Sequence, residues 1–230
     1  EIGIKEGLIV AIGPQVEGAS KEVLKLDSGS IISAGWIDAH VHCYEKMTLY
    51  YDNPDAIGVA SGVTSVIDAG STGESNIRDF YESTRSAKTN VFALLNISTE
   101  GIVKQDELAD LRKVDHVKNL ARIKELPDFI VGIKARMSKT VVGENNTIPL
   151  VMAKELQKDC DHLPLMVHVG SAPPKLEDVL ELLDKGDVVT HCYNGKDNGI
   201  LDADGTIKPF CWSAYRKGIY FDVGHGTEDR

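Results

Sequence analysis

Two histidines, placed two residues apart, are the first feature of this sequence that could do chemistry. His40 and His42 end an apolar run in the segment IDAHVHCYEK. If that run is a β-strand, residues i and i+2 project from one face, so both imidazoles point the same way. Such a pair makes a good fork for one divalent metal ion bound through ring nitrogens. The pair alone is weak evidence, so partners must be sought elsewhere in the chain.

Two further histidines stand at equivalent positions later in the chain. His168 ends the apolar run in LPLMVHVG and His191 ends the one in DVVTHCYNG, and a polar loop with glycine follows each. Either one alone is interpreted equally well as a core histidine bonded to a backbone carbonyl. Four of the seven histidines at three expected strand ends favour a shared metal site. Of the other three, His116 and His162 are interpreted as surface residues of helical segments. His225 is interpreted as a neighbour of the site that does not bind the metal.

One lysine is also out of place. Lys134 lies near the end of the apolar segment DFIVGIKARM, and lysine is almost never fully buried without a partner. As an ammonium ion it would repel a metal ion, but burial favours the neutral amine. The alternatives are a side chain that leans out to solvent or pairs with an acid.

The elements that must position these residues follow from the spacing of the apolar runs. Expected strands end near positions 42, 68, 96, 134, 168, 191 and 222, which is roughly one per 30 residues, the length of a βα unit. Near-continuous apolar strands are typical of a parallel sheet covered on both faces. The sequence therefore predicts an α/β fold, a (β/α)₈ TIM-type barrel with its last unit missing from the chain. A doubly wound open sheet is the alternative, but no GxGxxG follows the first strand.

The helices of this barrel are expected at 74–87, 106–124, 147–160 and 175–185. The barrel itself, with strands one to seven, is assigned to residues 34–230. Residues 1–33 are interpreted as the N-terminal strands of a small β-sandwich domain, with a hairpin around Glu6 and Gly7 and a further strand in EVLKLD. Because the chain begins without methionine and stops after a strand-like segment, we expect it to be a piece of a longer protein.

Composition excludes several classes of function. The 42% hydrophobic and 26% charged residues are ordinary for a globular protein, and a net charge of −10 disfavours nucleic acid as a partner. No apolar run of about 18 residues and no basic-then-apolar leader is present, so neither a membrane partner nor a signal peptide is expected. The four cysteines include no CxxC motif, which favours a reducing, cytoplasmic location. A small-molecule substrate is expected, and formation of a homo-oligomer stays open.

Taken together, SAGWIDAHVH, the strand-end Lys134, His168 in MVHVG and His191 in VTHCYNG resemble the amidohydrolase superfamily. The resemblance is to its dihydroorotase-like branch, in the amidohydrolase/deacetylase group of metallohydrolases, and it spans essentially the whole chain. It implies that CO₂ carboxylates Lys134 and that the resulting carbamate bridges two metal ions, usually zinc. By position, His40, His42 and Lys134 would hold one zinc ion, and Lys134, His168 and His191 the other.

The resemblance also implies the reaction. A metal-bridging hydroxide would hydrolyse an amide, cyclic amide or acetyl ester of a small molecule, so residues 34–230 would be a metal-dependent hydrolase acting on carbon–nitrogen bonds other than peptide bonds. The alternatives are an adenine-type purine or pyrimidine deaminase of the same superfamily, dihydroorotase proper, and a non-enzymatic relative that kept the barrel. The aspartate that the family uses as general acid and base on strand eight would lie beyond residue 230, and Asp222 is not given its role.

Substrate contacts are expected from four residues near these positions. Arg136 shares the inward face of Lys134 and could bind an anionic group or form an exterior salt bridge. Tyr193 and Asn194 could hydrogen-bond substrate or shape the loop after His191. Tyr44 stands where dihydroorotases typically carry an arginine for a substrate carboxylate, and a hydroxyl does not replace a bidentate cation. This departure disfavours dihydroorotase activity.

Overall fold

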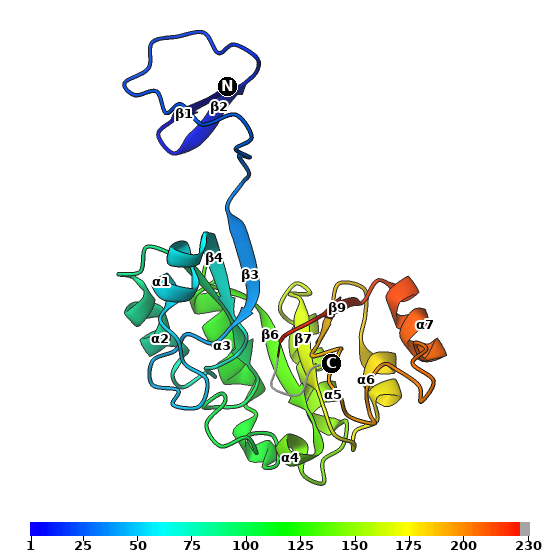
Figure 1. Cartoon of the computed structure of the whole chain (residues 1–230). Coiled ribbons are helices and arrows are strands. Elements are labelled where there is room, and N and C mark those ends of the chain that lie inside the picture. The colour runs from blue at the N-terminus through cyan, green and yellow to red at the C-terminus, as the bar shows by residue number, and fades with distance from the viewer. Residues whose placement is uncertain (226–230) are drawn as a thin grey trace. The chain divides into compact units, whose positions relative to one another are not determined.

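Residues 1–225 are described by a computed structural model in which the chain divides into two units, Glu1–Ala34 and Gly35–Arg230 (Figure 1). The first unit contains the antiparallel strands β1 (Ile2–Lys5) and β2 (Leu8–Ile12). Glu6 and Gly7 connect them with positive φ angles of 53° and 78°, which are the angles that a tight two-residue hairpin needs.

The strand expected in EVLKLD is not formed, so that prediction is wrong. Residues 22–27 have no strand structure, and the Leu24 side chain is 80% exposed. The apolar–polar alternation is present, but within the described part of this unit no third strand offers it a ladder of hydrogen bonds. The hairpin is the part of the expected β-sandwich that these residues form.

Seven parallel strands form the sheet of the second unit, and they follow one another in sequence order from β3 to β9. This order never reverses, whereas a doubly wound sheet reverses its order at a switch point. The fold is therefore of the TIM-barrel type, as predicted. The strands are β3 (Trp36–Val41), β4 (Val63–Asp68), β5 (Asn90–Asn96), β6 (Ile130–Met137), β7 (Leu165–Val169), β8 (Val188–Thr190) and β9 (Tyr220–Asp222).

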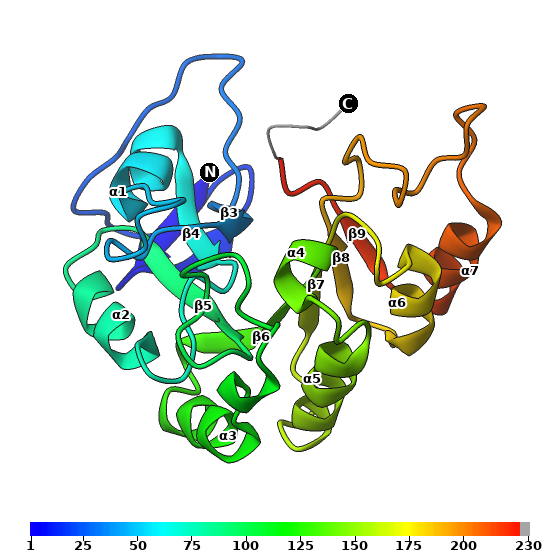
Figure 2. The ribbon, with the colours of Figure 1, turned by 90° about the horizontal axis from the view of Figure 1, so that it is seen from below.

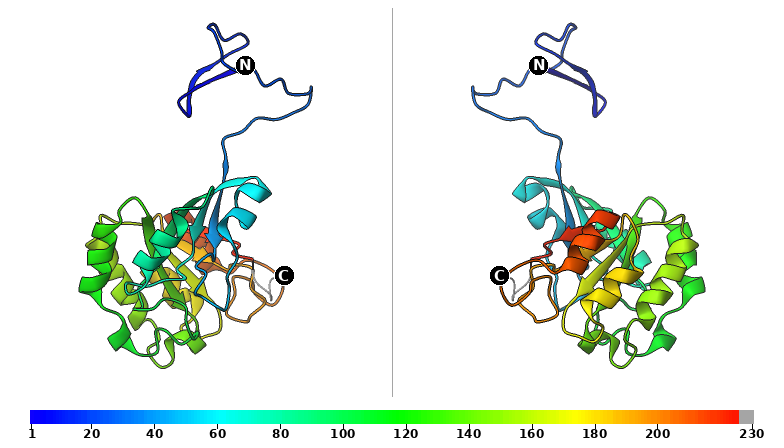
Figure 3. Two further views of the ribbon diagram at one scale, coloured as in Figure 1. Left: turned by 90° about the vertical axis from the view of Figure 1, so that its left-hand side faces the viewer. Right: turned by 90° about the vertical axis from the view of Figure 1, so that its right-hand side faces the viewer.

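Helices lie on the outer side of the curled sheet, as Figures 2 and 3 show for α2, α3, α5, α6 and α7. All the described helices are α1 (Pro54–Ile57), α2 (Ile77–Thr84), α3 (His116–Glu125), α4 (Lys139–Val142), α5 (Ile148–Lys158), α6 (Leu176–Leu182) and α7 (Pro209–Lys217), with two 3₁₀ turns at Val59–Ser61 and Leu111–Lys113.

The helix expected over 106–124 is wrong in its first half. Asp115 caps α3, because its carboxylate accepts a hydrogen bond from the Lys118 amide, and the helix begins only at His116. Before that cap, the Glu107 side chain is buried and forms an ion pair with Arg136 of β6. We attribute the absence of an α-helix over 106–113 to this tertiary contact, which the local sequence pattern does not show.

Alternation along β6 separates the two faces of the sheet. Ile133, Ala135 and Met137 belong to the large core beneath the helices. Lys134 and Arg136, at the alternate positions, face the barrel interior, where a small apolar cluster of Ala69, Leu94 and Met166 fills the space below them. The register then places Arg136 opposite His168, His168 opposite Thr190, and Thr190 opposite Asp222. One row of polar side chains thus crosses four strands near their carboxyl ends.

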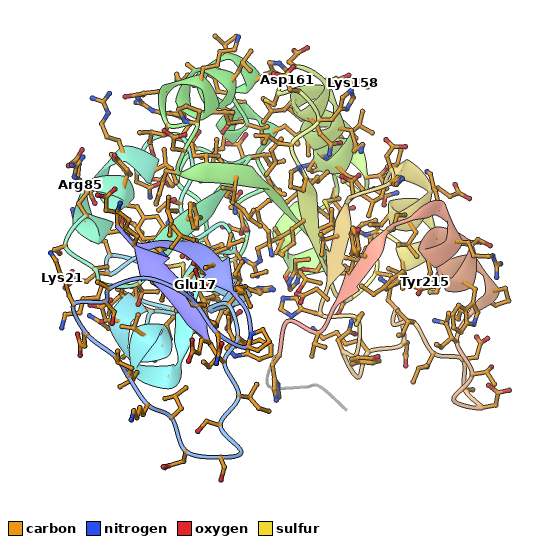
Figure 4. The ribbon with its side chains drawn as sticks, turned by 90° about the horizontal axis from the view of Figure 1, so that it is seen from above. Glu17, Lys21, Arg85, Lys158, Asp161 and Tyr215 are labelled. Atoms are coloured by element: carbon orange, nitrogen blue, oxygen red, sulfur yellow. The ribbon has the colours of Figure 1, made fainter. Side chains whose placement is uncertain are left out.

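Polar and charged side chains lie on the outer surface of the helices. Arg85 after α2, Lys158 of α5 and Tyr215 of α7 point away from the sheet (Figure 4). In the part of the chain that is described, no helix is long and apolar enough to cross a membrane.

Candidate metal centre

A cavity of about 730 Å³ lies at the carboxyl ends of the strands. It brings together all five residues that the sequence predicts as metal ligands, from β3 and the residue that follows it, from β6 and β7, and from the loop after β8. Aromatic and polar side chains of the connecting loops complete its wall. Its lining includes His40, His42, Lys134, His168, His191, Tyr50, Tyr51, Arg136, Asn194, Lys196 and His225.

The four imidazoles are spaced as ligands of shared metal ions would be. The ring centroids of His40 and His42 are 5.7 Å apart, those of His40 and His191 5.0 Å, and those of His168 and His191 4.7 Å. Zinc–nitrogen bonds of about 2.0–2.1 Å place two imidazoles on one tetrahedral ion with centroids about 5 Å apart. The separations of the rings are therefore compatible with ligands of shared metal ions.

Two of these rings are held by acceptors on their Nδ1 atoms. Nδ1 of His40 lies 3.0 Å from Oδ2 of Asp222 and 2.8 Å from Oγ1 of Thr190, whose own proton is donated to Asp222. Nδ1 of His191 is hydrogen-bonded to the carbonyl oxygen of Gly224. Because the Asp222 carboxylate and the Gly224 carbonyl can only accept, each Nδ1 carries a proton, and the neutral form of each ring has its lone pair on Nε2. An imidazole in that tautomer is a metal ligand.

Burial keeps three of the imidazoles neutral. Desolvation, followed by the charge of Lys134, lowers the pKa of His40 to about 4. Desolvation likewise lowers the pKa of His42 and of His168 well below the usual value, with Lys134 as the next cause for His42 and Arg136 for His168. At physiological pH these rings have a lone pair to give.

Lys134 is buried among them, with 1% of its surface exposed. Its Nζ lies 3.2 Å from the sulfur of Met166, and burial, with the charge of Arg136 second, lowers its pKa to about 7. Gly70 makes this position possible. With φ at 85°, a Cβ on Gly70 would lie 2.5 Å from Cβ and Cγ of Lys134, so a side chain there would displace the lysine.

Of the predicted substrate contacts, Arg136 and Asn194 lie on the cavity wall. Arg136 is held by Glu107, whose carboxylate oxygens lie 3.1 and 3.3 Å from its Nη1. Asn194 shapes the turn after β8, because its Nδ2 donates to the carbonyl of His191, which adopts a left-handed φ of 62°. His225, interpreted from the sequence as a neighbour of the site, also lines the cavity.

Tyr44 and Tyr193 do not line the cavity. After β3 the chain turns, with the Met47 amide bonded to the Tyr44 carbonyl. The Tyr44 side chain then packs against Phe80 of α2 and donates its hydroxyl proton to Asp79. The Tyr193 side chain is 48% exposed. Strand alternation, which places the metal-site residues, no longer applies once the strand has ended, and this is why both positions differ from the expectation.

Several residues of the site were missed by sequence reasoning. Thr190 and Asp222 hold His40, and Glu107 holds Arg136, as described above. Ser71 contacts His42, and its partner Asp68 ends β4. Asp68 could have been found, since a carboxylate at the end of the buried run VTSVIDAG is unusual. The loop residue Ser71 gave no such signal.

The donor set fits a metal centre that depends on the lysine. Within residues 1–225, no group of three or more His, Cys, Asp or Glu side chains is arranged to hold a metal ion. The imidazoles of His42, His40, His191 and His168 form a row, in that order, with neighbouring ring centroids 4.7–5.7 Å apart. Lys134 lines the same cavity, and a carbamate on its Nζ would add the anionic donor that the imidazoles lack.

Comparison with known proteins gives close relatives. No family model matches the chain. The chain is 59% identical to a protein of Enterococcus faecalis named "Deacetylase", over 99% of the chain and 62% of that protein. A crystal structure titled as an adenine deaminase matches with a TM-score of 0.97 and 59% identity, covering 99% of this chain and 62% of that one. A crystal structure titled as a dihydroorotase matches with a TM-score of 0.83 and 35% identity, covering 95% and 58%. The chain thus spans about three-fifths of the length of these relatives.

Proposed function

Since the chain belongs to the dihydroorotase-like branch of the amidohydrolase superfamily, we propose that the whole protein is a metal-dependent hydrolase of small molecules that cleaves an amide, a cyclic amide or an acetyl ester. The observation that carries this proposal is the meeting of four imidazoles and one buried lysine in a single cavity. The relative named as a deacetylase supports an acetyl group as the acyl group that is removed.

In this proposal two zinc ions would be bound by His40, His42, His168 and His191 together with a carboxylated Lys134. His40 and His42 would serve one ion and His168 and His191 the other, with Lys134 as a ligand of both. When bound, such ions activate water at neutral pH and polarise the acyl carbonyl.

Lys134 would become the carbamate by reaction of its side-chain amine with CO₂. Its neutral amine attacks CO₂, forms an N–C bond and releases one proton, and the product is an anion. The pKa of about 7 supports this step, because a sizeable fraction of the amine is then neutral in the metal-free protein. Carboxylation would also turn a group that can be a cation into an anion, which suits a ligand of divalent metal ions.

The chain's other residues orient ligands and substrate. Asp222 and Gly224 fix the protons on Nδ1 of His40 and His191, respectively, which leaves Nε2 of each ring for the metal. Glu107 fixes one edge of the Arg136 guanidinium. Arg136 and Lys196 give the cavity wall positive charge that suits an anionic group on the substrate, and Asn194 is a candidate hydrogen-bond partner from the loop.

Two other activities in the same superfamily are separate candidates. The structure titled as an adenine deaminase favours purine deamination, although many such enzymes use one metal ion and need no bridging lysine. The structure titled as a dihydroorotase favours dihydroorotate. Against it, Tyr44 faces Asp79 rather than the cavity, so position 44 offers a substrate carboxylate no contact.

The test is a substrate panel on the full-length protein loaded with zinc in bicarbonate buffer. We expect acetate release from an O- or N-acetylated carboxylic acid and about two zinc ions per chain. Ammonia release from adenine would instead support the deaminase. Turnover of dihydroorotate with kcat/KM of about 10⁴ M⁻¹s⁻¹ or more, above that for every acetylated compound, would contradict the proposal.

A further inference from the structure

Ser71 lies between a histidine of the metal centre and a buried carboxylate. Nδ1 of His42 is 2.9 Å from Oγ of Ser71, and that Oγ is 2.7 Å from Oδ2 of Asp68. Ser71 is 1% exposed and Asp68 is fully buried. The three groups therefore form a chain of hydrogen bonds that runs from the cavity wall into the sheet.

The direction of each proton in this chain is set by Asp68. Its Oδ2 accepts from the Cys43 amide at 2.9 Å, and its Oδ1 accepts from the Ser71 amide at 2.7 Å. Burial raises the pKa of Asp68, but the hydrogen bonds from the Cys43 amide, the Ser71 amide and the Ser71 hydroxyl oppose this and favour the ionised carboxylate. An ionised carboxylate can only accept, so the Ser71 hydroxyl donates to it.

A hydroxyl has one proton, so Ser71 can only accept from the ring of His42. His42 must then carry its proton on Nδ1. In water a neutral histidine side chain favours the other tautomer, with the proton on Nε2, where it would block a metal ion. A carboxylate and a carbonyl, which can only accept, impose the same tautomer on His40 and His191. For His42 the tautomer depends on which way a hydroxyl points.

We propose that Ser71, oriented by Asp68, is a positioning residue that fixes His42 as the Nδ1–H tautomer and keeps its Nε2 free for metal. The role in metal binding rests on the proposed function. The tautomer itself does not, because it is a property of the metal-free chain.

The first test reads the tautomer directly. Long-range ¹⁵N–¹H correlation spectra of the metal-free full chain, labelled with ¹⁵N-histidine at pH 8, should show the His42 proton on Nδ1; the His42→Gln variant assigns the signals. Ser71→Ala should shift His42 mainly to the Nε2–H form. Ser98→Ala is the matched control, since Ser98 is also 1% exposed but donates to the Gly101 carbonyl and contacts no histidine. A wild-type His42 with its proton on Nε2 would overturn the inference, and so would an unchanged tautomer in Ser71→Ala.

The second test asks whether the tautomer affects metal binding. Zinc affinity, measured by competition with a chelating indicator in bicarbonate buffer, should fall about 10- to 100-fold in Ser71→Ala and stay within about twofold in Ser98→Ala. Equal affinity in the two variants would overturn the positioning role. If the wild-type chain bound no zinc, the proposed function would fail, whereas the spectra would still decide the inference about His42.

A third variant should reverse the direction of the Ser71 hydroxyl proton while the hydroxyl itself stays in place. In Asp68→Asn the amide can donate to Ser71, which turns the hydroxyl proton toward His42 and should move the ring to the Nε2–H form. Retention of the Nδ1–H form in a folded Asp68→Asn protein would contradict the role of Asp68. If that variant does not fold, the wild-type spectrum still decides the tautomer.

Discussion

Replacement of Lys134 by methionine should stabilise the metal-free chain at neutral pH while it abolishes zinc binding. The lysine is buried at 1% exposure, and its Nζ lies 3.2 Å from the Met166 sulfur. The charges of nearby carboxylates only partly offset the effect of this burial on its pKa. Methionine has similar length and fills the same space beside Met166 without a charge. The change therefore removes the cost of burying an amine and, with it, the group that would become the carbamate.

The magnitude follows from the pKa of about 7, against 10.5 for an unperturbed lysine. Between these two values the unfolded chain binds one more proton than the folded chain, so the free energy of unfolding of the wild type rises with pH. The slope is about 1.4 kcal/mol per pH unit. Relative to the methionine variant, the penalty from Lys134 is about 4 kcal/mol at pH 7 and about 1.5 kcal/mol at pH 9.5. It is largest below pH 7 and disappears above pH 10.5.

Urea unfolding at several pH values, in CO₂-free buffer with a chelator, measures this difference. Other groups titrate in the same range, but they are common to both proteins and cancel when Lys134→Met is compared with the wild type. Two stability curves that run parallel from pH 6.5 to 9.5 would refute the reasoning, because the lysine would then have the same pKa folded and unfolded. After exposure to bicarbonate and zinc, the variant should keep less than one zinc ion per chain.

Three further substitutions should behave differently from Lys134→Met. Lys154→Met should lower the free energy of unfolding by about 3–5 kcal/mol in urea titrations, because the Lys154 ammonium lies 2.6 Å from the carboxylate of Asp187, which is 1% exposed and would lose its charge partner; an unchanged midpoint would contradict this. Tyr44→Phe should leave kcat/KM of the full-length enzyme within about twofold, since the lost hydroxyl contacts no cavity residue, and a tenfold loss would show that Tyr44 reaches the substrate. Gly70→Ala should destabilise the chain by more than about 1 kcal/mol through its positive φ and lower zinc content by displacing Lys134, so a normally loaded variant would argue against the close approach.

The barrel could be predicted because its signals are local and repeated. Each strand is a short, largely apolar run, and β6 and β7 are buried almost throughout. In a parallel sheet all carboxyl ends meet at one edge. A polar residue at such an end, like His168, therefore lies at the mouth of the barrel whatever path the connecting loops take. Lys134 is found by the same logic, since an amine within a buried run must face the one polar region that the strand can reach.

The remaining contacts of the site depend on where each loop folds back onto the sheet. The spacing of residues along the chain does not encode that. Ser71 and Gly224 reach the imidazoles from loops 29 and 33 residues away from their partners. The 106–124 segment has helical periodicity, but the ion pair of Glu107 with Arg136 outweighs it. Tyr44 lies two residues beyond His42, yet a turn directs it to α2.

The hydrogen bond between His40 and Asp222 joins residues 182 positions apart. Every strand pairing in the sheet, by contrast, links neighbours along the chain, so the strands can pair one after another as a growing chain leaves the ribosome. Closing a long loop costs chain entropy. The contact between His40 and Asp222 therefore forms after the contacts between neighbouring strands have shortened the effective loop between them. His40 is made early in synthesis, but it gains its acceptor only when β9 is in place. A nascent or truncated chain without Asp222 would leave that imidazole free to change tautomer. If the proposed metal centre forms, we therefore expect strong metal binding only in chains that have completed the seventh strand.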